Sequence, residues 1–135
     1  MLKWLGSPII VLCFAQAVTA QTEPTQAEKD AWAKDPKAQI LESSPCKKVT
    51  WLTESEAKLP AAEKGIHTAL GWYGRGFIEG ATYMIGDKAL KAAGDFGLSV
   101  DVVAAHITTY CYGNPNGTPA DAVQDLLLKV LQTAK

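Results

Sequence analysis

The sequence has little clustered charge of either sign. Arg75 is its only arginine, and 13 basic residues are interspersed with 14 acidic ones, for a formal net charge of −1 at pH 7. Nucleic-acid backbones are bound by clustered lysine and arginine, so we expect no nucleic-acid partner. The two histidines, His67 and His106, are far apart and belong to no HxxxH pair or Cys/His cluster. We therefore expect no metal site, because zinc needs several such ligands together.

Long hydrophobic runs are scarce as well. One spans about 5–18, after the basic residue Lys3, and small residues follow it up to Ala20. The run is shorter than the ~20 residues of a bilayer-spanning helix, and its order of charge, apolar run and small residues is typical of a secretory signal peptide. We expect residues 1–20 to be cleaved after Ala20 on export from a bacterial cytoplasm, leaving no membrane anchor. The alternative is a transmembrane anchor.

Cysteine is rare too. Cys13 lies within the signal peptide, so the mature chain keeps only Cys46 and Cys111. A pair of cysteines in an exported chain predicts a disulfide, with two free thiols or half of a metal site as the alternatives. A bond that closes a loop of this length stabilises a fold by roughly 4 kcal/mol in the chain-entropy account.

Strand patterns of any length are missing, and four segments carry helix signals. A hydroxyl residue before proline marks helix starts at 44–45 and 118–119, and Ser99 is placed to cap another helix. The predicted helices span about 45–53, 60–84, 99–113 and 118–132. They predict an all-α fold, a small bundle of four main helices over 45–135 tied by one disulfide. We expect residues 86–97 to form a loop with one helical turn at most.

A polar leader, residues 21–44, precedes this domain. Thr25 and Glu28 have the spacing of a capping box, which predicts a short helix over 26–34. Trp32 is a large apolar side chain that could dock this helix on the body. Between the two, we favour a mobile arm, because the leader has few other large apolar residues.

The second predicted helix combines an apolar stripe with many glycines. The stripe consists of Ile66, Leu70, Tyr73, Phe77, Ala81 and Met84, at steps of three and four. Glycine in a helix interior costs roughly 1 kcal/mol relative to alanine, so these glycines need a packing reason. Gly76 and Gly80 lie on one face, where we expect another helix to approach closely. The alternative is a bare backbone surface that receives a ligand.

Catalytic patterns are missing. Both mature cysteines are assigned to the disulfide, and no nucleophile elbow is present. Glu79 has no second carboxylate placed to face it, and Arg75, four residues earlier, is its simplest partner. The glycine spacing 74–76–80 follows no strand, so it is not a dinucleotide-binding loop. We expect a protein that is not an enzyme and needs no cofactor.

The remaining pattern is distinctive as a whole. A cysteine opens the first helix, the second helix contains tryptophan, aromatic residues and spaced glycines, and the third ends in a cysteine ahead of a polar turn. The residues that carry this pattern are Cys46, Trp72, Gly76, Phe77, Gly80, Cys111, Asn114 and Pro115. Over about 46–131 the chain resembles the HdeA/HdeB family of periplasmic acid-stress chaperones, from which it departs in its long leader and in the insertion at 86–97.

This resemblance implies a periplasmic holdase of the acid-stress response that is folded at neutral pH, with a homodimer as one expected form. In strong acid the 14 carboxylates become neutral. Without Lys3, the 12 remaining basic residues and two histidines bring the mature chain to about +14 plus its amino terminus, and this repulsion loosens a compact fold. Apolar stripes would then bind unfolding periplasmic proteins. The candidate client-binding residues are Phe77, Val103, Ile107, Leu126 and Leu127.

The scaffold is also similar to that of small periplasmic immunity proteins that neutralise wall-degrading amidase toxins. This similarity implies a module that acts folded at neutral pH and blocks a toxin enzyme. We would expect such a module to use an exposed loop, at 86–97 or 112–118. Likeness of fold alone does not decide between this role and that of a chaperone.

Overall fold

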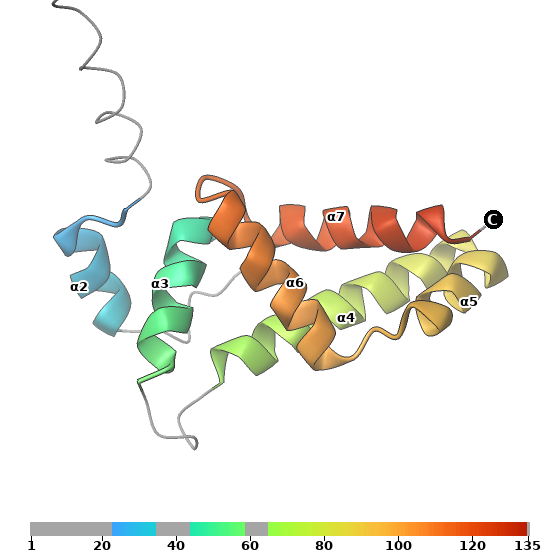
Figure 1. Ribbon diagram of the computed structural model, residues 1–135, viewed down its shortest axis with the longest axis horizontal. Coiled ribbons are helices and arrows are strands. Elements are labelled where there is room, and N and C mark those ends of the chain that lie inside the picture. The colour runs from blue at the N-terminus through green and yellow to red at the C-terminus, as the bar shows by residue number, and fades with distance from the viewer. Residues whose placement is uncertain (1–22, 35–43, 59–64, 135) are drawn as a thin grey trace, which may run out of the picture.

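The computed structural model describes residues 23–34, 44–58 and 65–134, and all regular structure in these ranges is helical. The helices are α2 (Gln26–Lys34), α3 (Cys46–Glu56), α4 (Ile66–Ile85), α5 (Asp87–Phe96), α6 (Val100–Gly113) and α7 (Pro119–Gln132). The molecule is elongated, with α2 and α3 at one end and α5 at the other (Figure 1). The predicted all-α fold is confirmed. The predicted signal peptide, 1–20, lies outside the described residues.

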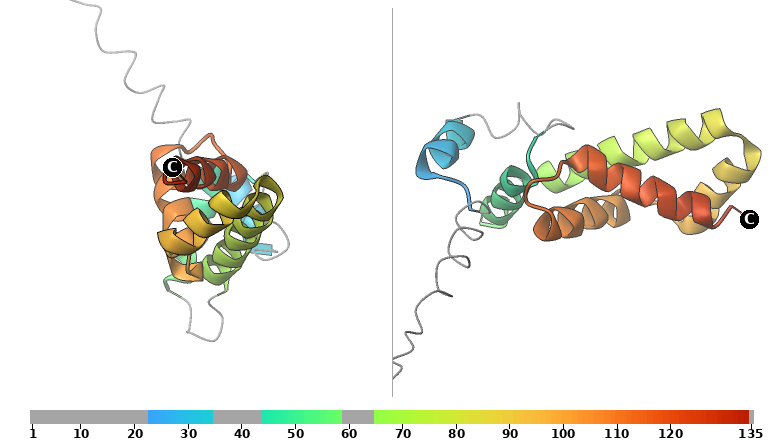
Figure 2. Two further views of the ribbon diagram at one scale, coloured as in Figure 1. Left: turned by 90° about the vertical axis from the view of Figure 1, so that its right-hand side faces the viewer. Right: turned by 90° about the horizontal axis from the view of Figure 1, so that it is seen from above.

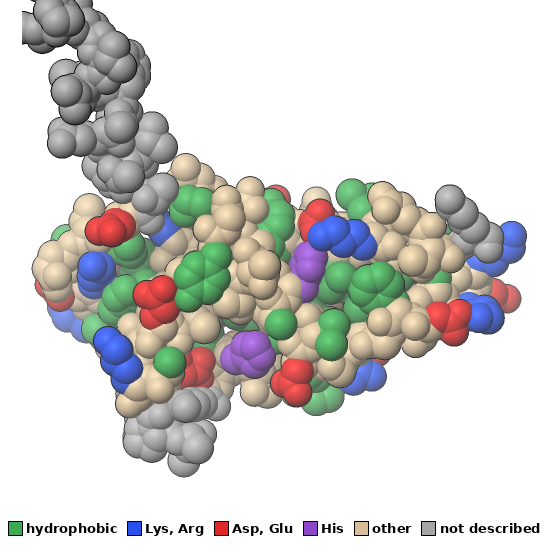
Figure 3. Space-filling view, viewed as in Figure 1, with side chains coloured by type: hydrophobic (Ala, Val, Ile, Leu, Met, Phe, Trp, Pro, Cys, Tyr) green, Lys and Arg blue, Asp and Glu red, His purple; other side chains and the backbone are tan. Residues whose placement is uncertain are grey.

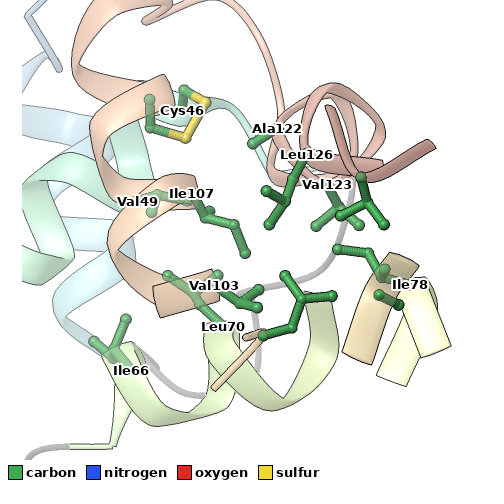
Figure 4. Close-up of a cluster of buried hydrophobic side chains, with 14 of the residues drawn as sticks. Cys46, Val49, Ile66, Leu70, Ile78, Val103, Ile107, Ala122, Val123 and Leu126 are labelled. Carbon is green, nitrogen blue, oxygen red and sulfur yellow. A yellow bond between two sulfur atoms is a disulfide. The ribbon is translucent and has the colours of Figure 1, made fainter. Parts of the chain in front are cut away.

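One hydrophobic core joins α3, α4, α5, α6 and α7, and α5 contributes only Ala92 and Ala93 to it. Side chains of α3, α4, α6 and α7 point inward (Figure 4), and the most completely buried include Val49, Leu70, Ile78, Val103, Ile107, Val123 and Val130. The disulfide between Cys46 and Cys111 lies at the edge of this core, with a Cα–Cα distance of 4.7 Å. The predicted disulfide is thus confirmed, and it ties the first turn of α3 to the last turn of α6.

Close packing between α4 and α6 depends on two glycines. A Cβ atom on Gly71 would lie 2.2 Å from the carbonyl oxygen of Val100, and one on Gly74 would lie 2.5 Å from a methyl carbon of Val103. The buried side of α4 therefore runs through Ile66, Leu70, Gly71, Gly74, Ile78 and Thr82. The predicted stripe is right at Ile66 and Leu70, and its Tyr73 packs partly buried against the core. It is wrong at Phe77 and Met84, which are exposed because the buried side continues one residue away from the predicted positions.

Helix α5 replaces the loop expected at 86–97. Its buried residues are Ala89, Ala92 and Ala93, which have helical spacing but only small apolar side chains. Gly97 ends the helix with a φ of 71°, in the left-handed region that favours glycine after a helix. The expectation of one helical turn was wrong because an alanine stripe is a weak hydrophobic signal.

The caps of α6 and α7 agree with the prediction. The Ser99 hydroxyl accepts a hydrogen bond from the Val102 amide, and Thr118 and Asp121 form a reciprocal capping box. The start of α3 differs: its N-cap is Pro45, which makes no side-chain cap. The amides of Cys46 and Lys47 instead donate to carbonyl oxygens of the turn between α6 and α7. The turn thus satisfies two amides that would otherwise lack a helical partner.

Helix α2 is present at the predicted bounds and is docked on α3. Thr25 and Glu28 form the predicted capping-box bonds, with the Thr25 amide 2.8 Å from the Glu28 carboxylate. Trp32 is only 8% exposed, and its ring centroid lies 5.6 Å from that of Trp51 on α3. Within residues 23–34, the leader is therefore a docked helix rather than a mobile arm.

Candidate interaction surface

The outward face of α4 is the main apolar surface of the described chain that has no partner within it. We define this α4 face as Trp72, Gly76, Phe77, Gly80, Tyr83 and Met84, which lie on the side of the helix turned away from α6. Seen from above, α4 forms one long edge of the molecule (Figure 2). Tyr83 is 72% exposed and Met84 is 83% exposed. With Trp72 and Phe77 they present apolar area on the order of 400 Å², a size often associated with binding.

Gly76 and Gly80 form the floor of this face. Nothing within the described chain lies within 4 Å of a Cβ placed on either residue. The expectation that these two glycines admit another helix of the same chain is therefore wrong, and Gly71 and Gly74 have that role instead. The two glycines leave a strip of bare helix backbone between exposed aromatic side chains, which is the alternative that the sequence left open.

A groove of about 630 Å³ borders the α4 face, between α4 and α5. Its lining includes Arg75, Glu79, Tyr83, Leu90, Gly94 and Leu98. The Arg75 guanidinium donates to the Glu79 carboxylate at 2.7 Å, which confirms the predicted pair, and lies 5.7 Å from the centre of the Trp72 ring. An ion pair and an aromatic ring thus stand beside an apolar cleft, a combination suited to binding a mixed polar and apolar segment.

The predicted client-binding residues divide into two groups. Val103 and Ile107 are 0% exposed and Leu126 is 2% exposed, so all three belong to the core of the folded protein. Leu127 is half-buried against that core. Phe77 is 44% exposed and is the one candidate that the folded protein presents outward. Access to Val103, Ile107 and Leu126 requires the helices to separate.

The pattern residues after α6 have clear structural roles. The Asn114 side-chain amide donates to the Tyr110 carbonyl, and the Asn114 carbonyl accepts from the Gly117 amide. The Pro115 carbonyl accepts from the Lys47 amide at 3.0 Å. Both residues therefore shape the turn that caps α3, beside the disulfide. They are parts of the scaffold.

Carboxylates join four pairs of helices. Glu28 of α2 accepts a hydrogen bond from Lys47 of α3 at 2.9 Å. Glu56 of α3 is 4% exposed and accepts from the first amide of α4, that of Ile66, at 2.8 Å. The other two carboxylates are Glu54, which accepts from Tyr112 of α6, and Asp125 of α7, which lies 3.0 Å from His106 of α6. Each of these contacts weakens when the carboxylate is protonated.

The environment shifts the pKa of two of these carboxylates downward. The pKa of Glu28 is lowered first by its hydrogen bond from Lys47 and then by its bond from the Thr25 amide. The pKa of Asp125 is lowered mainly by a hydrogen bond from Lys129. A carboxylate with a lowered pKa stabilises the fold above its ordinary pKa of about 4, and this contribution is lost as the pH falls through the lowered value.

The phenol of Tyr112 is shifted in the opposite sense. Burial raises its pKa, and the hydrogen bond that it donates to Glu54 raises it further. The phenol is therefore a hydrogen-bond donor throughout the acid and neutral range. This hydrogen bond from Tyr112 to Glu54 joins α6 to α3 beside the disulfide.

Residues 23–34, 44–58 and 65–134 were also compared with the requirements of a metal site and of a membrane-spanning helix. No three His, Cys, Asp or Glu side chains there are grouped so that they could hold a metal ion. No helix there is long and apolar enough to cross a membrane. Acidic, basic and hydrophobic side chains are interspersed over the face drawn in Figure 3.

Comparison of the chain with models of protein families, with curated proteins and with solved structures gives no match.

Proposed function

We propose that this protein is an exported holdase chaperone of acid stress, which loosens at low pH and holds unfolding proteins in the periplasm. The observation that carries the proposal is the set of carboxylates that join α2 to α3, α3 to α4, α3 to α6 and α6 to α7. Each contact is made by a carboxylate and weakens when that carboxylate is neutral, and at Glu28 and Asp125 the pKa is lowered by these surroundings. The disulfide between α3 and α6 does not titrate and stays closed.

Loosening under these conditions would expose the apolar residues that a holdase needs. Separation of α6 and α7 from α4 uncovers Val103, Ile107 and Leu126, which are buried in the folded protein. These residues would extend the surface already presented by Phe77 and the rest of the α4 face. Positive charge on the lysines then keeps the complexes apart, because like-charged particles repel.

A disulfide also supports export, since such bonds persist in oxidising compartments outside the cytoplasm. It sets a limit on loosening as well. The bond holds the start of α3 next to the end of α6, so the chain cannot extend fully in acid. A partly opened chain keeps its apolar residues clustered, which favours multivalent contact with a client.

Suppression of aggregation tests the proposal. The mature protein is mixed with an acid-labile client at about pH 2 and about pH 7, and light scattering is followed. We expect suppression at near-stoichiometric ratios at pH 2 and little at pH 7. Continued aggregation at pH 2 would overturn the proposal.

A matched pair of variants links the activity to the α4 face. Phe77→Ser removes an exposed apolar side chain from this face, and Leu128→Ser removes one that is 60% exposed on α7. We expect Phe77→Ser to require several-fold more protein for half-suppression, and Leu128→Ser to act like the parent chain.

The exposed α4 face also favours a second candidate, a binding or immunity module that blocks a toxin enzyme at neutral pH. Its aromatic side chains are available while the protein is folded. A tight complex isolated from periplasm at pH 7 and lost in Phe77→Ser would support this role. The Phe77→Ser variant therefore tests the holdase function at pH 2 and the binding function at pH 7.

A further inference from the structure

One glutamate holds α2 in two ways. One carboxylate oxygen of Glu28, Oε2, accepts from the amide and hydroxyl of Thr25 and so caps α2. The other oxygen, Oε1, accepts from the Lys47 ammonium on α3 at 2.9 Å. Protonation of this single group therefore weakens both the helix and its attachment. A nine-residue helix is marginal in water without such support.

The rest of the contact between α2 and α3 is aromatic. Trp32 packs against Trp51 at a tilt of 51°, and the Lys48 ammonium lies 5.8 Å from the centre of the Trp32 ring. Lys48 is 4% exposed, so this ammonium is held among its neighbours rather than in free solvent. The contact between the two tryptophan rings and the contact of the Lys48 ammonium with Trp32 are aromatic and cation–π contacts. Neither of these two contacts is made through a carboxylate.

A second groove, of about 650 Å³, adjoins this contact and gives a partner a path to it. Its lining includes Trp51 and Thr50 of α3 and the aromatic ring of Tyr112 at the end of α6. Among the described residues, the charged groups that line this groove are Glu23, Lys29, Lys47 and Glu54, and Lys47 is the one paired with Glu28. The groove thus combines acidic and basic side chains with aromatic walls.

We propose that Trp51 and Lys48 on α3 form a binding site for aromatic side chains, which α2 fills with its own Trp32 and which an aromatic side chain of a client fills after α2 has left. The site deepens the proposed function, on which it rests, by naming the chemistry of the client segment. Helix α2 is then a built-in competitor. Its tether gives it an effective concentration of the order of millimolar, so a dilute client displaces it only when Glu28 no longer holds it.

Peptide binding without any aggregating client tests the site. The probe is a fluorescently labelled peptide of residues 23–34, and the control peptide carries Trp32→Ala. The receptor is the full mature chain, either unchanged or with Trp32→Ala, which empties the site. At pH 7 we expect the probe to bind the Trp32→Ala chain at least tenfold more tightly than the unchanged chain, and the control peptide to bind neither.

The role of acid is tested by two isosteric substitutions. Glu28→Gln removes the charge that ties α2 to Lys47, and Asp95→Asn removes a charge that pairs with Lys91 within α5. We expect Glu28→Gln to raise probe binding at pH 7 at least several-fold and Asp95→Asn to leave it unchanged. The unchanged chain should bind a probe that carries Glu28→Gln, whose own affinity does not depend on this charge, at least several-fold more tightly at pH 2 than at pH 7.

The proposed site is disproved if the two peptides bind equally, or if the Trp32→Ala chain does not bind the probe. A circular-dichroism melt shows whether that chain is folded. If it is not, Lys48→Met in the Glu28→Gln chain serves instead, and the site fails if probe binding does not fall. Suppressed aggregation without probe binding would disprove the site alone, and probe binding without suppression would disprove the holdase function.

Discussion

Two glycines of α4, Gly74 and Gly80, have opposite surroundings. A methyl group on Gly74 would overlap the side chain of Val103, and one on Gly80 would meet open space. Overpacking of a core costs about 1–3 kcal/mol, whereas alanine on an open helix surface gains about 0.5–1 kcal/mol over glycine. The two residues are therefore expected to respond in opposite directions to the same substitution.

We predict that Gly74→Ala lowers the free energy of unfolding by about 1–3 kcal/mol and that Gly80→Ala raises it by about 0.5–1 kcal/mol. Urea unfolding at pH 7, followed by far-ultraviolet circular dichroism, measures both. A gain in stability for Gly74→Ala would show that α6 does not pack on this glycine. Weaker client binding by Gly80→Ala, despite its higher stability, would show that the bare backbone of the α4 face is used.

At the scale of single residues, some of these side-chain contacts could be predicted from the sequence and others could not. The pairs Arg75–Glu79 and Thr25–Glu28 were predictable because their partners lie three or four residues apart on one helix. Glu56 gave no such signal, because it caps a different helix ten residues later. Its role depends on how α3 and α4 meet, which spacing along the chain does not contain.

At the scale of elements, α4 begins under a cap that α3 provides. Glu56 accepts from the Ile66 amide at 2.8 Å and lies near that of His67 at 3.4 Å. A buried hydrogen bond to a charged group contributes about 1.5–3 kcal/mol, and the positive end of the helix dipole favours this carboxylate further. The start of the longest helix therefore depends on a titratable side chain.

We predict that Glu56→Ala lowers the free energy of unfolding at pH 7 by about 1.5–3 kcal/mol. Glu54→Ala, two residues earlier, loses only the exposed hydrogen bond from Tyr112 and is expected to cost less, about 0.5–1 kcal/mol. Hydrogen exchange should show the loss first in the initial turn of α4. Unchanged protection of those amides in Glu56→Ala would contradict the capping role.

Helix ends with local signals were easier to predict than helix faces. Ser99 and Thr118 mark their helices because each cap is made within three residues. Helix α5 was missed because alanine contributes little to an apolar pattern. The buried face of α4 was misplaced because glycine and threonine face the neighbour, and only the tertiary packing of α6 explains why.

At the scale of the whole molecule, acid acts on several separate carboxylate contacts between helices. The lowered pKa values of Glu28 and Asp125 mean that their contributions are complete above about pH 4 and fade below it. We predict that the melting temperature falls steeply below about pH 4 and that Glu28→Gln with Asp125→Asn flattens this fall while lowering stability at pH 7. Calorimetry from pH 2 to 7 measures both effects.

The disulfide is predicted to matter more in acid than at neutral pH. Cys46→Ala, or reduction, should lower the melting temperature at pH 7 and abolish aggregation suppression at pH 2, because the opened chain then extends fully. The loss of a native disulfide typically costs about 2–5 kcal/mol in a small exported domain. Suppression that survives reduction unchanged would mean that the bond only reinforces the neutral fold.

The position of the disulfide also orders events in time. Cys46 and Cys111 are 65 residues apart, and a chain that emerges from its amino terminus exposes Cys46 long before its partner. At synthesis rates of about 5–20 residues per second, the delay is roughly 3–13 s. In the export that we propose, Cys46 waits through that interval without Cys111, so the native bond forms only after the end of α6 has emerged.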